Sequence, residues 1–133
     1  MHTHTRTPRR TLHLLTAAGA MTVALTATGE SVAHAASAKQ AYKDYAASQF
    51  RSAAQFDCLD QLWEAESNWN PTAQNPTSTA YGIAQFLDAT WATTGIAKTS
   101  DPYLQIDAGL IYIDERYDTA CNAWAFHQAN NWY

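Results

Sequence analysis

Basic residues are scarce in this chain, and their scarcity excludes several kinds of partner. The 133 residues contain eight Lys and Arg against twelve Asp and Glu, a formal net charge of −4. Three of the eight lie within the first ten residues, so from residue 36 onward five bases stand against eleven acids, a formal charge of −6. An acidic chain without a basic stripe is a poor candidate for binding nucleic acid or an anionic membrane. We therefore expect neither partner.

Long apolar runs are also missing after the N-terminal segment. The basic first ten residues are followed by an apolar, Thr-rich run from Thr11 to Thr28. Ala33-His34-Ala35 then places small residues at both positions of a signal-peptidase site, with Ala36-Ser37-Ala38 as a second choice. The run is short for a transmembrane helix, which needs about 20 predominantly apolar residues. We predict that residues 1–35 are a secretory signal peptide, and that no membrane span remains after its removal.

The remaining residues are enough for one domain and too few for two. We predict a weakly amphipathic helix over Ser37 to about Gln55, so that residues 36–55 form an N-terminal helical segment or linker and residues 56–133 form the domain. Asp88 is a plausible N-cap for a brief helix. Asp101-Pro102 starts a longer helix, with the acid as cap and proline at the first helical position. A last helix from about Thr119 completes a mostly α fold, for which we expect a monomer.

Cysteine and histidine are both rare after residue 35. The two cysteines, Cys58 and Cys121, would meet an oxidising compartment after export, which favours a disulfide over the alternative of two buried thiols. In the loop-entropy model such a bridge stabilises the fold by about 4 kcal/mol. His127 is the single histidine of this part of the chain. With scattered acids it offers too few ligands for a metal site, so we expect neither a metal nor a cofactor.

One acid, Glu66, falls where the helical pattern predicts an apolar residue. The stripe formed by Leu59, Leu62 and Trp63 reaches Glu66 at the next turn. Burial of a carboxyl raises its pKa toward values that are useful for donating a proton. The alternative is a solvated carboxylate at a helix end, where register is uncertain by a residue or two. Glu66 is therefore a candidate general acid.

Four segments carry a resemblance to a known family. Glu66-Ser67, Ala80-Tyr81-Gly82-Ile83-Ala84-Gln85, the run from Gln105 to Ile113 and Ala123-Trp124-Ala125 resemble, in order and rough spacing, the lytic transglycosylase (SLT) domain of the lysozyme superfamily. The resemblance covers about Phe56 to Tyr133. It implies a small lysozyme-like helical domain with a short loop or β-like segment beside an active-site cleft. It also implies that Glu66 is the single catalytic acid/base and that the substrate is peptidoglycan.

The resemblance further implies roles for the neighbours of Glu66. Ser67 would orient the acid or the substrate, Gly82 would let the backbone approach the sugar, and Gln85 would hydrogen-bond near the acid. The other substrate-binding candidates are aromatic or polar groups expected along the cleft: Trp69 as a wall, Tyr81, Trp124 and Gln128. Plainer interpretations exist for each, as a turn glycine, a solvated amide or a core aromatic. The asparagine of the family's Ala-Tyr-Asn motif is replaced here by alanine, so its task falls to Asn122, His127 or Gln128, or to no residue.

The implied reaction is cleavage of the β-1,4 bond between N-acetylmuramic acid and N-acetylglucosamine, with 1,6-anhydromuramyl products. A two-carboxylate hydrolase would need a partner about 5 to 9.5 Å from Glu66. Asp88 and Asp101 are the only acids on the loop side of the domain, and each is better explained as a helix cap. The alternatives are a hydrolytic muramidase, a non-catalytic peptidoglycan-binding module, and a secreted structural or partner-binding protein that keeps the fold. In each case we expect a secreted, cell-wall-associated protein.

Overall fold

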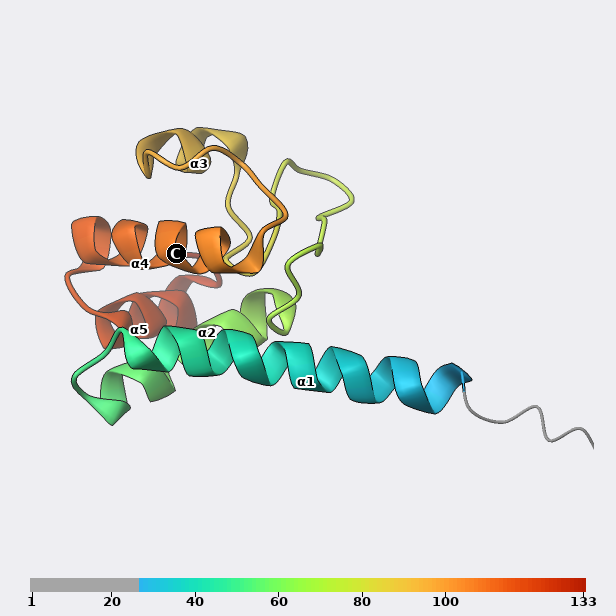
Figure 1. Cartoon of the computed structure of the whole chain (residues 1–133). Helices are drawn as coiled ribbons and strands as arrows, with labels where there is room; N and C mark the ends of the chain where they lie inside the picture. The colour runs from blue at the N-terminus through green and yellow to red at the C-terminus, as the bar shows by residue number, and fades with distance from the viewer. Residues whose placement is uncertain (1–26) are drawn as a thin grey trace, which may run out of the picture.

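A computed structural model describes residues 27–133, and the mostly helical prediction is confirmed there (Figure 1). Most of the predicted signal peptide, residues 1–26, lies outside the described residues. The helices of the described part are α1 (Ala27–Ser48), α2 (Ala53–Ser67), α3 (Asp88–Thr93), α4 (Pro102–Tyr117) and α5 (Ala120–Asn130). Within this part, no helix has the length and apolar character that are needed to cross a bilayer.

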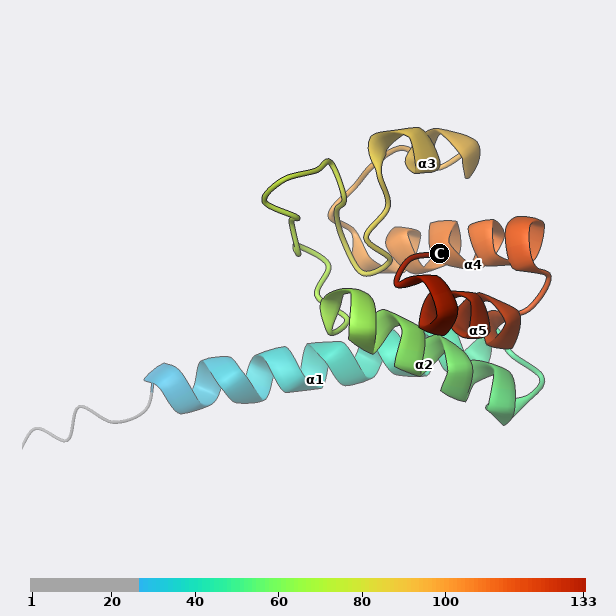
Figure 2. The same ribbon diagram turned by 180° about the vertical axis from the view of Figure 1, so that it is seen from behind.

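The loop between α2 and α3 is the short β-like segment that the resemblance implied. It contains two isolated antiparallel bridges, Gln74 with Tyr81 and Tyr81 with Phe86. Figures 1 and 2 show this loop rising from the end of α2 to α3, on the side of the domain opposite α1. The domain is therefore a set of packed helices with one folded loop above the end of α2.

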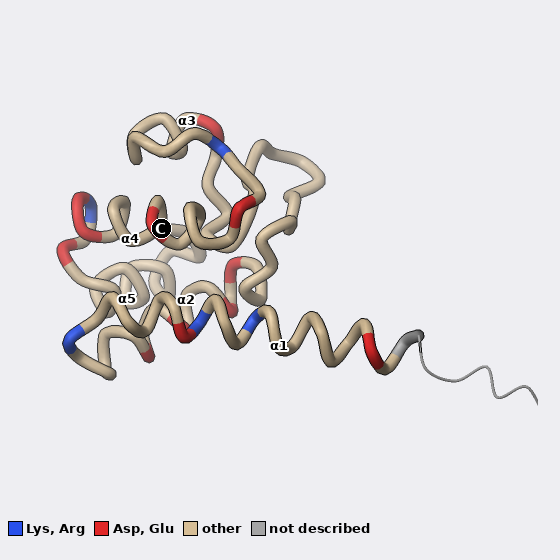
Figure 3. Tube along the Cα trace, in the orientation of Figure 1, with Lys and Arg blue, Asp and Glu red and all other residues tan. Residues whose placement is uncertain are grey.

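The second half of α1 packs against the domain. Ala46 is fully buried, and the Tyr45 hydroxyl donates a hydrogen bond to Asp107 of α4 at 2.8 Å. Figure 3 shows how few Lys and Arg positions the described residues contain. Lys43 lies 2.7 Å from Asp60 and 2.7 Å from Glu64, both on α2. These contacts all lie after Ala35, the residue at the predicted cleavage site.

The helix predicted from Ser37 to about Gln55 is in fact two helices. α1 ends at Ser48 and α2 begins at Ala53, with the chain reversing over the four residues between them. Phe50 in this turn packs against Phe56 of α2, with ring centroids 6.5 Å apart. The prediction missed the break because aromatic spacing alone does not distinguish one long helix from two that fold back on each other.

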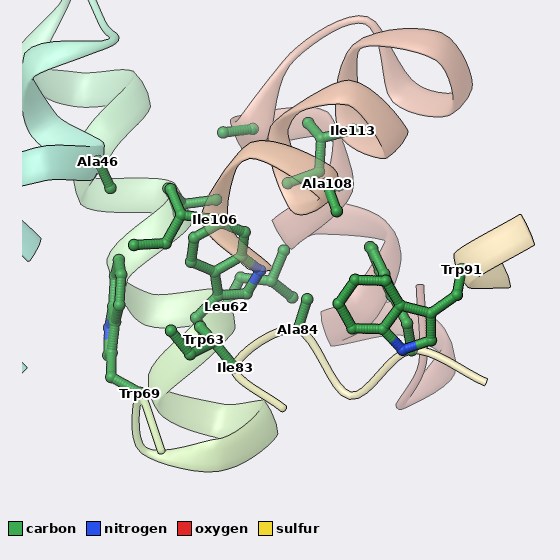
Figure 4. Packing of buried hydrophobic residues seen from close by; sticks show 14 residues of the cluster. Ala46, Leu62, Trp63, Trp69, Ile83, Ala84, Trp91, Ile106, Ala108 and Ile113 are labelled. Carbon is green, nitrogen blue, oxygen red and sulfur yellow. The ribbon is translucent and has the colours of Figure 1, made fainter. Parts of the chain in front are cut away.

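The core forms around the indole of Trp63, which is fully buried (Figure 4). α4 approaches this ring closely at Gly109, where an added Cβ would lie 2.4 Å from a ring carbon. The backbone of α4 therefore packs directly against the core at this point. The buried apolar side chains around Trp63 include Leu59 and Leu62 of α2, Ile83 of the loop, and Ile106 and Ala108 of α4.

The two predicted helix caps have different outcomes. Asp101 caps α4 as expected, since its carboxylate accepts hydrogen bonds from the backbone N–H groups of Tyr103 at 2.9 Å and Leu104 at 3.2 Å. Asp88 does not cap α3: it is the first helical residue, and its carboxylate pairs with Lys98 at 2.7 Å. A cation so close competes for the carboxylate that would otherwise accept from the helix N–H groups.

The predicted disulfide between Cys58 and Cys121 is present, with Cα atoms 4.9 Å apart. It joins α2 to α5, the two helices that pack most extensively against each other. The relation between these helices decides what surrounds Glu66, because Glu66 is the penultimate residue of α2.

Candidate active site

Glu66 lines a pocket of about 320 Å³ at the end of α2. Its side chain is 17% exposed, so the carboxyl is mostly withdrawn from water without being sealed off. The helix ends one residue later, where Asn68 and Trp69 adopt left-handed conformations with φ of 55° and 58°. The other residues that line the pocket come from the loop, α3 and the C-terminal segment: Ala84, Gln85, Phe86, Leu87, Thr90, Asn131, Trp132 and Tyr133.

Burial raises the pKa of the Glu66 carboxyl from 4.5 to about 7. Removal from water disfavours the charged form of an acid, and a pKa near ambient pH suits a group that must both give and take a proton. The position of Glu66 in the apolar stripe of α2 thus places its carboxyl in a pocket that is largely shielded from water.

His127 of α5 is the immediate partner of Glu66. Its Nε2 atom lies 3.0 Å from Oε1 of Glu66, and its side chain is 16% exposed. The Trp124 ring stacks on the imidazole, with centroids 5.4 Å apart and planes 19° from parallel. Burial lowers the pKa of His127 and raises the pKa of Glu66. When the pair holds a single titratable proton, that proton therefore resides on Glu66, and both side chains are neutral.

Of the three candidates for the task of the family's asparagine, His127 is therefore the one that contacts the acid. The Asn122 amide donates to the carbonyl of Tyr117 at 2.9 Å, away from Glu66. Gln128 is exposed on α5.

Ser67 and Gln85 hold the loop against the end of α2. The Ser67 hydroxyl donates to the carbonyl of Ile83 at 2.7 Å. The Gln85 amide donates to the carbonyls of Ala73 at 3.0 Å and Gly82 at 2.9 Å, and Gln85 also lines the Glu66 pocket. Both side chains hold the loop that contributes to the pocket, and neither has a hydrogen bond to Glu66 among those of the described residues.

Gly82 makes room for a side chain of the protein itself. Its φ is +83°, and an added Cβ would lie 2.6 Å from Oε1 of Gln105. Gln105 is buried on α4, where it accepts from the Ile83 N–H and donates to the carbonyls of Pro71 and Thr99, each at 2.8 Å. Sequence reasoning gave Gln105 no role, although an amide next to Ile106 in an apolar helix was a signal that could have been used.

Two of the predicted aromatic contacts need correction or relocation. Trp69 does not wall the cleft: it is 1% exposed, its indole N–H donates to Asp60 at 2.8 Å, and its ring packs edge-on against Trp63. The left-handed turn after α2 carries it into the core. Tyr81 is half-buried with its hydroxyl 2.6 Å from the Ser100 hydroxyl, and it is not among the residues that line the Glu66 pocket.

The C-terminal residues form a wall that sequence reasoning missed. Trp132 lines the pocket and is 51% exposed, while Phe126 meets the edge of its ring at a centroid distance of 4.8 Å. The hydroxyl of Tyr133 accepts from the indole N–H of Trp63 at 2.9 Å and donates to the carbonyl of Ala84 at 3.2 Å. The sequence does show a tryptophan just after the last helix, but no local sequence pattern indicates that it lies near Glu66.

Comparison with known families identifies the class of protein. The family model described as Transglycosylase SLT domain matches residues 42–131, and the chain belongs to this family. The match begins inside α1, upstream of the predicted domain start near Phe56. At the level of the family, the match supports lytic transglycosylase activity on peptidoglycan. No curated protein and no solved structure matches the chain.

Proposed function

We propose that this protein is an exported peptidoglycan lytic transglycosylase that uses Glu66 as its single acid/base. One observation carries the proposal: a chain of the SLT family has one glutamate in a partly dry pocket, with its pKa raised to about 7. Such a carboxyl is substantially protonated near neutral pH and is still able to act as a base afterwards.

The proposed reaction uses the Glu66 carboxyl twice, first as the acid and then as the base. Protonated Glu66 gives its proton to the glycosidic oxygen between N-acetylmuramic acid and N-acetylglucosamine, and the bond to C1 of the muramyl residue breaks. The neighbouring acetamido group stabilises the positive charge that develops at C1. The Glu66 carboxylate then removes the proton from the C6 hydroxyl, whose oxygen bonds to C1. The product is a 1,6-anhydromuramyl end, the acid is protonated again, and no water is consumed.

The surroundings of Glu66 favour this route over hydrolysis by two carboxylates. Glu66 is the one carboxyl-bearing side chain among the residues that line its pocket. Asp88 is held in an exposed ion pair with Lys98, and Asp101 is engaged by the N–H groups of α4. A hydrolase would need a second free carboxylate about 5 to 9.5 Å from the first.

We propose Trp132 as the sugar-stacking wall in place of Trp69. Its ring is half exposed at the pocket, and it is held from one side by Phe126 while the Arg116 guanidinium lies 5.8 Å from its centroid. A fixed, exposed aromatic face suits the apolar face of a pyranose. Tyr81, Trp124 and Gln128 remain proposed contacts for a glycan strand that extends beyond the pocket.

We also propose export with removal of residues 1–35. The disulfide supports an oxidising location. Cleavage after Ala35 would leave the part of α1 that carries Lys39 and Lys43, so that the contacts of α1 with α2 would survive processing. We propose that the processed chain acts as a monomer at the cell wall.

The test is clearing of a purified peptidoglycan suspension by the wild type, Glu66→Gln and Glu64→Gln. Glu64 is a matched control, because it lies on the same helix but pairs with Lys39 and Lys43 on another face. We expect Glu66→Gln to lose activity by at least about 100-fold and Glu64→Gln to stay close to wild type. Mass spectrometry of the products should find anhydromuramyl ends. Reducing muramic ends alone would establish a hydrolase, and wall binding without any cleavage by the wild type would establish a binding module.

A further inference from the structure

We infer that His127 is a positioning residue that decides which oxygen of Glu66 carries the acid proton and that stabilises the carboxylate after the proton has left. The inference rests on the proposed function, because it gives His127 a part in the acid/base cycle of Glu66. It concerns a residue of this chain that stands close to the place where the family's asparagine motif is altered.

The geometry of the pair is held from several directions. Nε2 of His127 lies 3.0 Å from Oε1 of Glu66, a hydrogen-bonding distance. The stacked Trp124 ring fixes the plane of the imidazole from the neighbouring turn of α5. The disulfide and the packing of α2 on α5 fix the helices that carry the two side chains. The contact between His127 and Glu66 is therefore held in place by the surrounding structure.

The other ring nitrogen of His127 determines the tautomer. Nδ1 is buried, and it has no hydrogen-bond partner among the described residues. A proton on Nδ1 would be a buried donor without an acceptor, and an imidazolium would add a positive charge to that cost. The favoured form is a neutral ring with its proton on Nε2, which donates to Oε1 of Glu66. The lowered pKa of His127 and the raised pKa of Glu66 agree with this neutral pair.

This tautomer assigns different tasks to the two oxygens of Glu66. Oε1 accepts from His127, so in the protonated acid Oε1 is the carbonyl-type oxygen and the proton resides on Oε2. Oε2 is then the oxygen whose proton would pass to the glycosidic oxygen. When the proton has been given away, the same N–H donates to a carboxylate, and this charge-assisted hydrogen bond is stronger than the neutral one. His127 therefore favours the acid step and limits how far burial raises the pKa of Glu66.

The other ionisable groups around Glu66 do not compete for this role. Tyr133 faces Glu66 from the C-terminal segment, but its hydroxyl is engaged by Trp63 and Ala84 and burial raises its pKa well above the usual value, so it stays neutral. Arg116 of α4 lies over the rings of Tyr112, Tyr117 and Trp132. Lys39 and Lys43 of α1 are paired with acids on another face of α2. Asp88, at the start of α3, is paired with Lys98.

The experiment compares His127→Gln, which keeps an N–H donor at a similar reach, with His127→Leu, which removes it. The pKa of Glu66 is measured directly by carboxyl NMR titration, assigned with Glu66→Gln, and the pH dependence of glycan cleavage is measured in parallel. We expect the leucine variant to raise the titration midpoint of Glu66 by about one pH unit and to move the alkaline limb of activity with it. Its kcat should fall about tenfold with little change in KM, and the glutamine variant should stay near wild type in all three measurements.

Each outcome has a separate meaning. A Glu66 midpoint that is unmoved in the leucine variant would overturn the role of His127, whatever the activity. A glutamine variant that behaves like leucine would overturn the donor assignment. If the leucine variant does not fold, as judged by circular dichroism and thermal unfolding, methionine takes its place in the comparison. Absence of glycan cleavage by the wild type at every pH would instead overturn the proposed function, and the NMR titration distinguishes that failure from the failure of the His127 inference.

Discussion

Cys58 and Cys121 bridge the helix that carries Glu66 to the helix that carries His127. The bridge lies two turns before Glu66 on α2, and the backbone N–H of Cys121 also donates to the Gln55 side chain at 3.1 Å. Because α2 and α5 are each held at this end, rotation of one helix against the other is restricted. The contact between acid and imidazole is thus supported by a covalent link outside the pocket.

Removal of the disulfide should destabilise the fold and weaken this contact. The bridge closes a loop with a sequence separation of 63, for which chain entropy predicts a loss of roughly 4 kcal/mol in Cys58→Ser/Cys121→Ser. Urea unfolding of the double variant measures the loss, and reduction of the wild type is the control that should reproduce it. An unchanged unfolding midpoint in both would mean that packing alone holds α2 against α5.

Burial of Glu66 should make stability depend on pH in one direction. The folded pKa of about 7 lies above the ordinary value of 4.5, so the folded protein keeps a proton that the unfolded chain releases. The contribution is fully present below pH 4.5 and is lost as pH rises through 7. The difference corresponds to roughly 3 kcal/mol. Glu66→Gln, which cannot ionise, should therefore match the wild type in acid and become more stable above about pH 8.

Urea unfolding of the two proteins over a pH series is the measurement. Glu64→Gln is again the control, since the pKa of Glu64 is lowered by its lysine partners and its removal should not produce a gain at high pH. A stability gap that stays constant across the range from 4.5 to 7 would mean that the folded Glu66 carboxyl titrates normally.

Two tryptophans should respond in opposite ways to truncation. Trp132→Ala should weaken glycan binding and raise KM by roughly three- to tenfold, with little loss of stability, because its ring is half exposed at the pocket. Trp69→Ala should cost about 3 to 5 kcal/mol of stability, because its ring is buried against Trp63. Cleavage kinetics and thermal unfolding of both variants check the pair, and a KM effect confined to Trp69→Ala would restore it as the cleft wall.

The contrast between these tryptophans illustrates what the sequence could and could not predict. The apolar stripe of α2, the cap at Asp101 and the pairing of two cysteines follow from local spacing or from compartment, and all were predicted. The burial of the Glu66 carboxyl could be predicted for the same reason, because the spacing of the apolar stripe reaches this position. The burial of Trp69 depends on the left-handed backbone conformations of Asn68 and Trp69, which no local sequence pattern predicted.

The sequence did not predict that Trp132 lines the pocket, because this position also depends on tertiary packing. Trp132 lines the same pocket as Glu66 because α5 packs on α2 and the residues after α5 lie beside the loop. The sequence left the task of the family's missing asparagine to Asn122, His127 or Gln128, or to no residue, and only the fold shows that His127 lies against Glu66. Hydrophobic periodicity predicts which face of a helix is buried, but the contacts between residues of different elements depend on long-range packing.

The loop beside Glu66 should depend on the fit between Gly82 and Gln105. Gly82→Ala would place a methyl group 2.6 Å from Oε1 of Gln105 and would also force alanine into a left-handed conformation at φ +83°. We expect a loss of about 2 to 4 kcal/mol from strain and from hydrogen bonds of Gln105 that are broken. Because Gln105 holds the Ile83 N–H and the carbonyls of Pro71 and Thr99, activity should fall together with stability.

Gly95→Ala separates the two causes. Gly95 has a similar φ of +74°, but an added Cβ there meets nothing within 4 Å, so this variant measures backbone strain alone. It should lose about 1 kcal/mol and keep its activity. Combining Gly82→Ala with Gln105→Ala removes the crowding and should cost less than the sum of the single changes. Equal losses for Gly82→Ala and Gly95→Ala, with additive behaviour in the double variant, would mean that the amide yields to the methyl group and that its hydrogen bonds do not hold the loop.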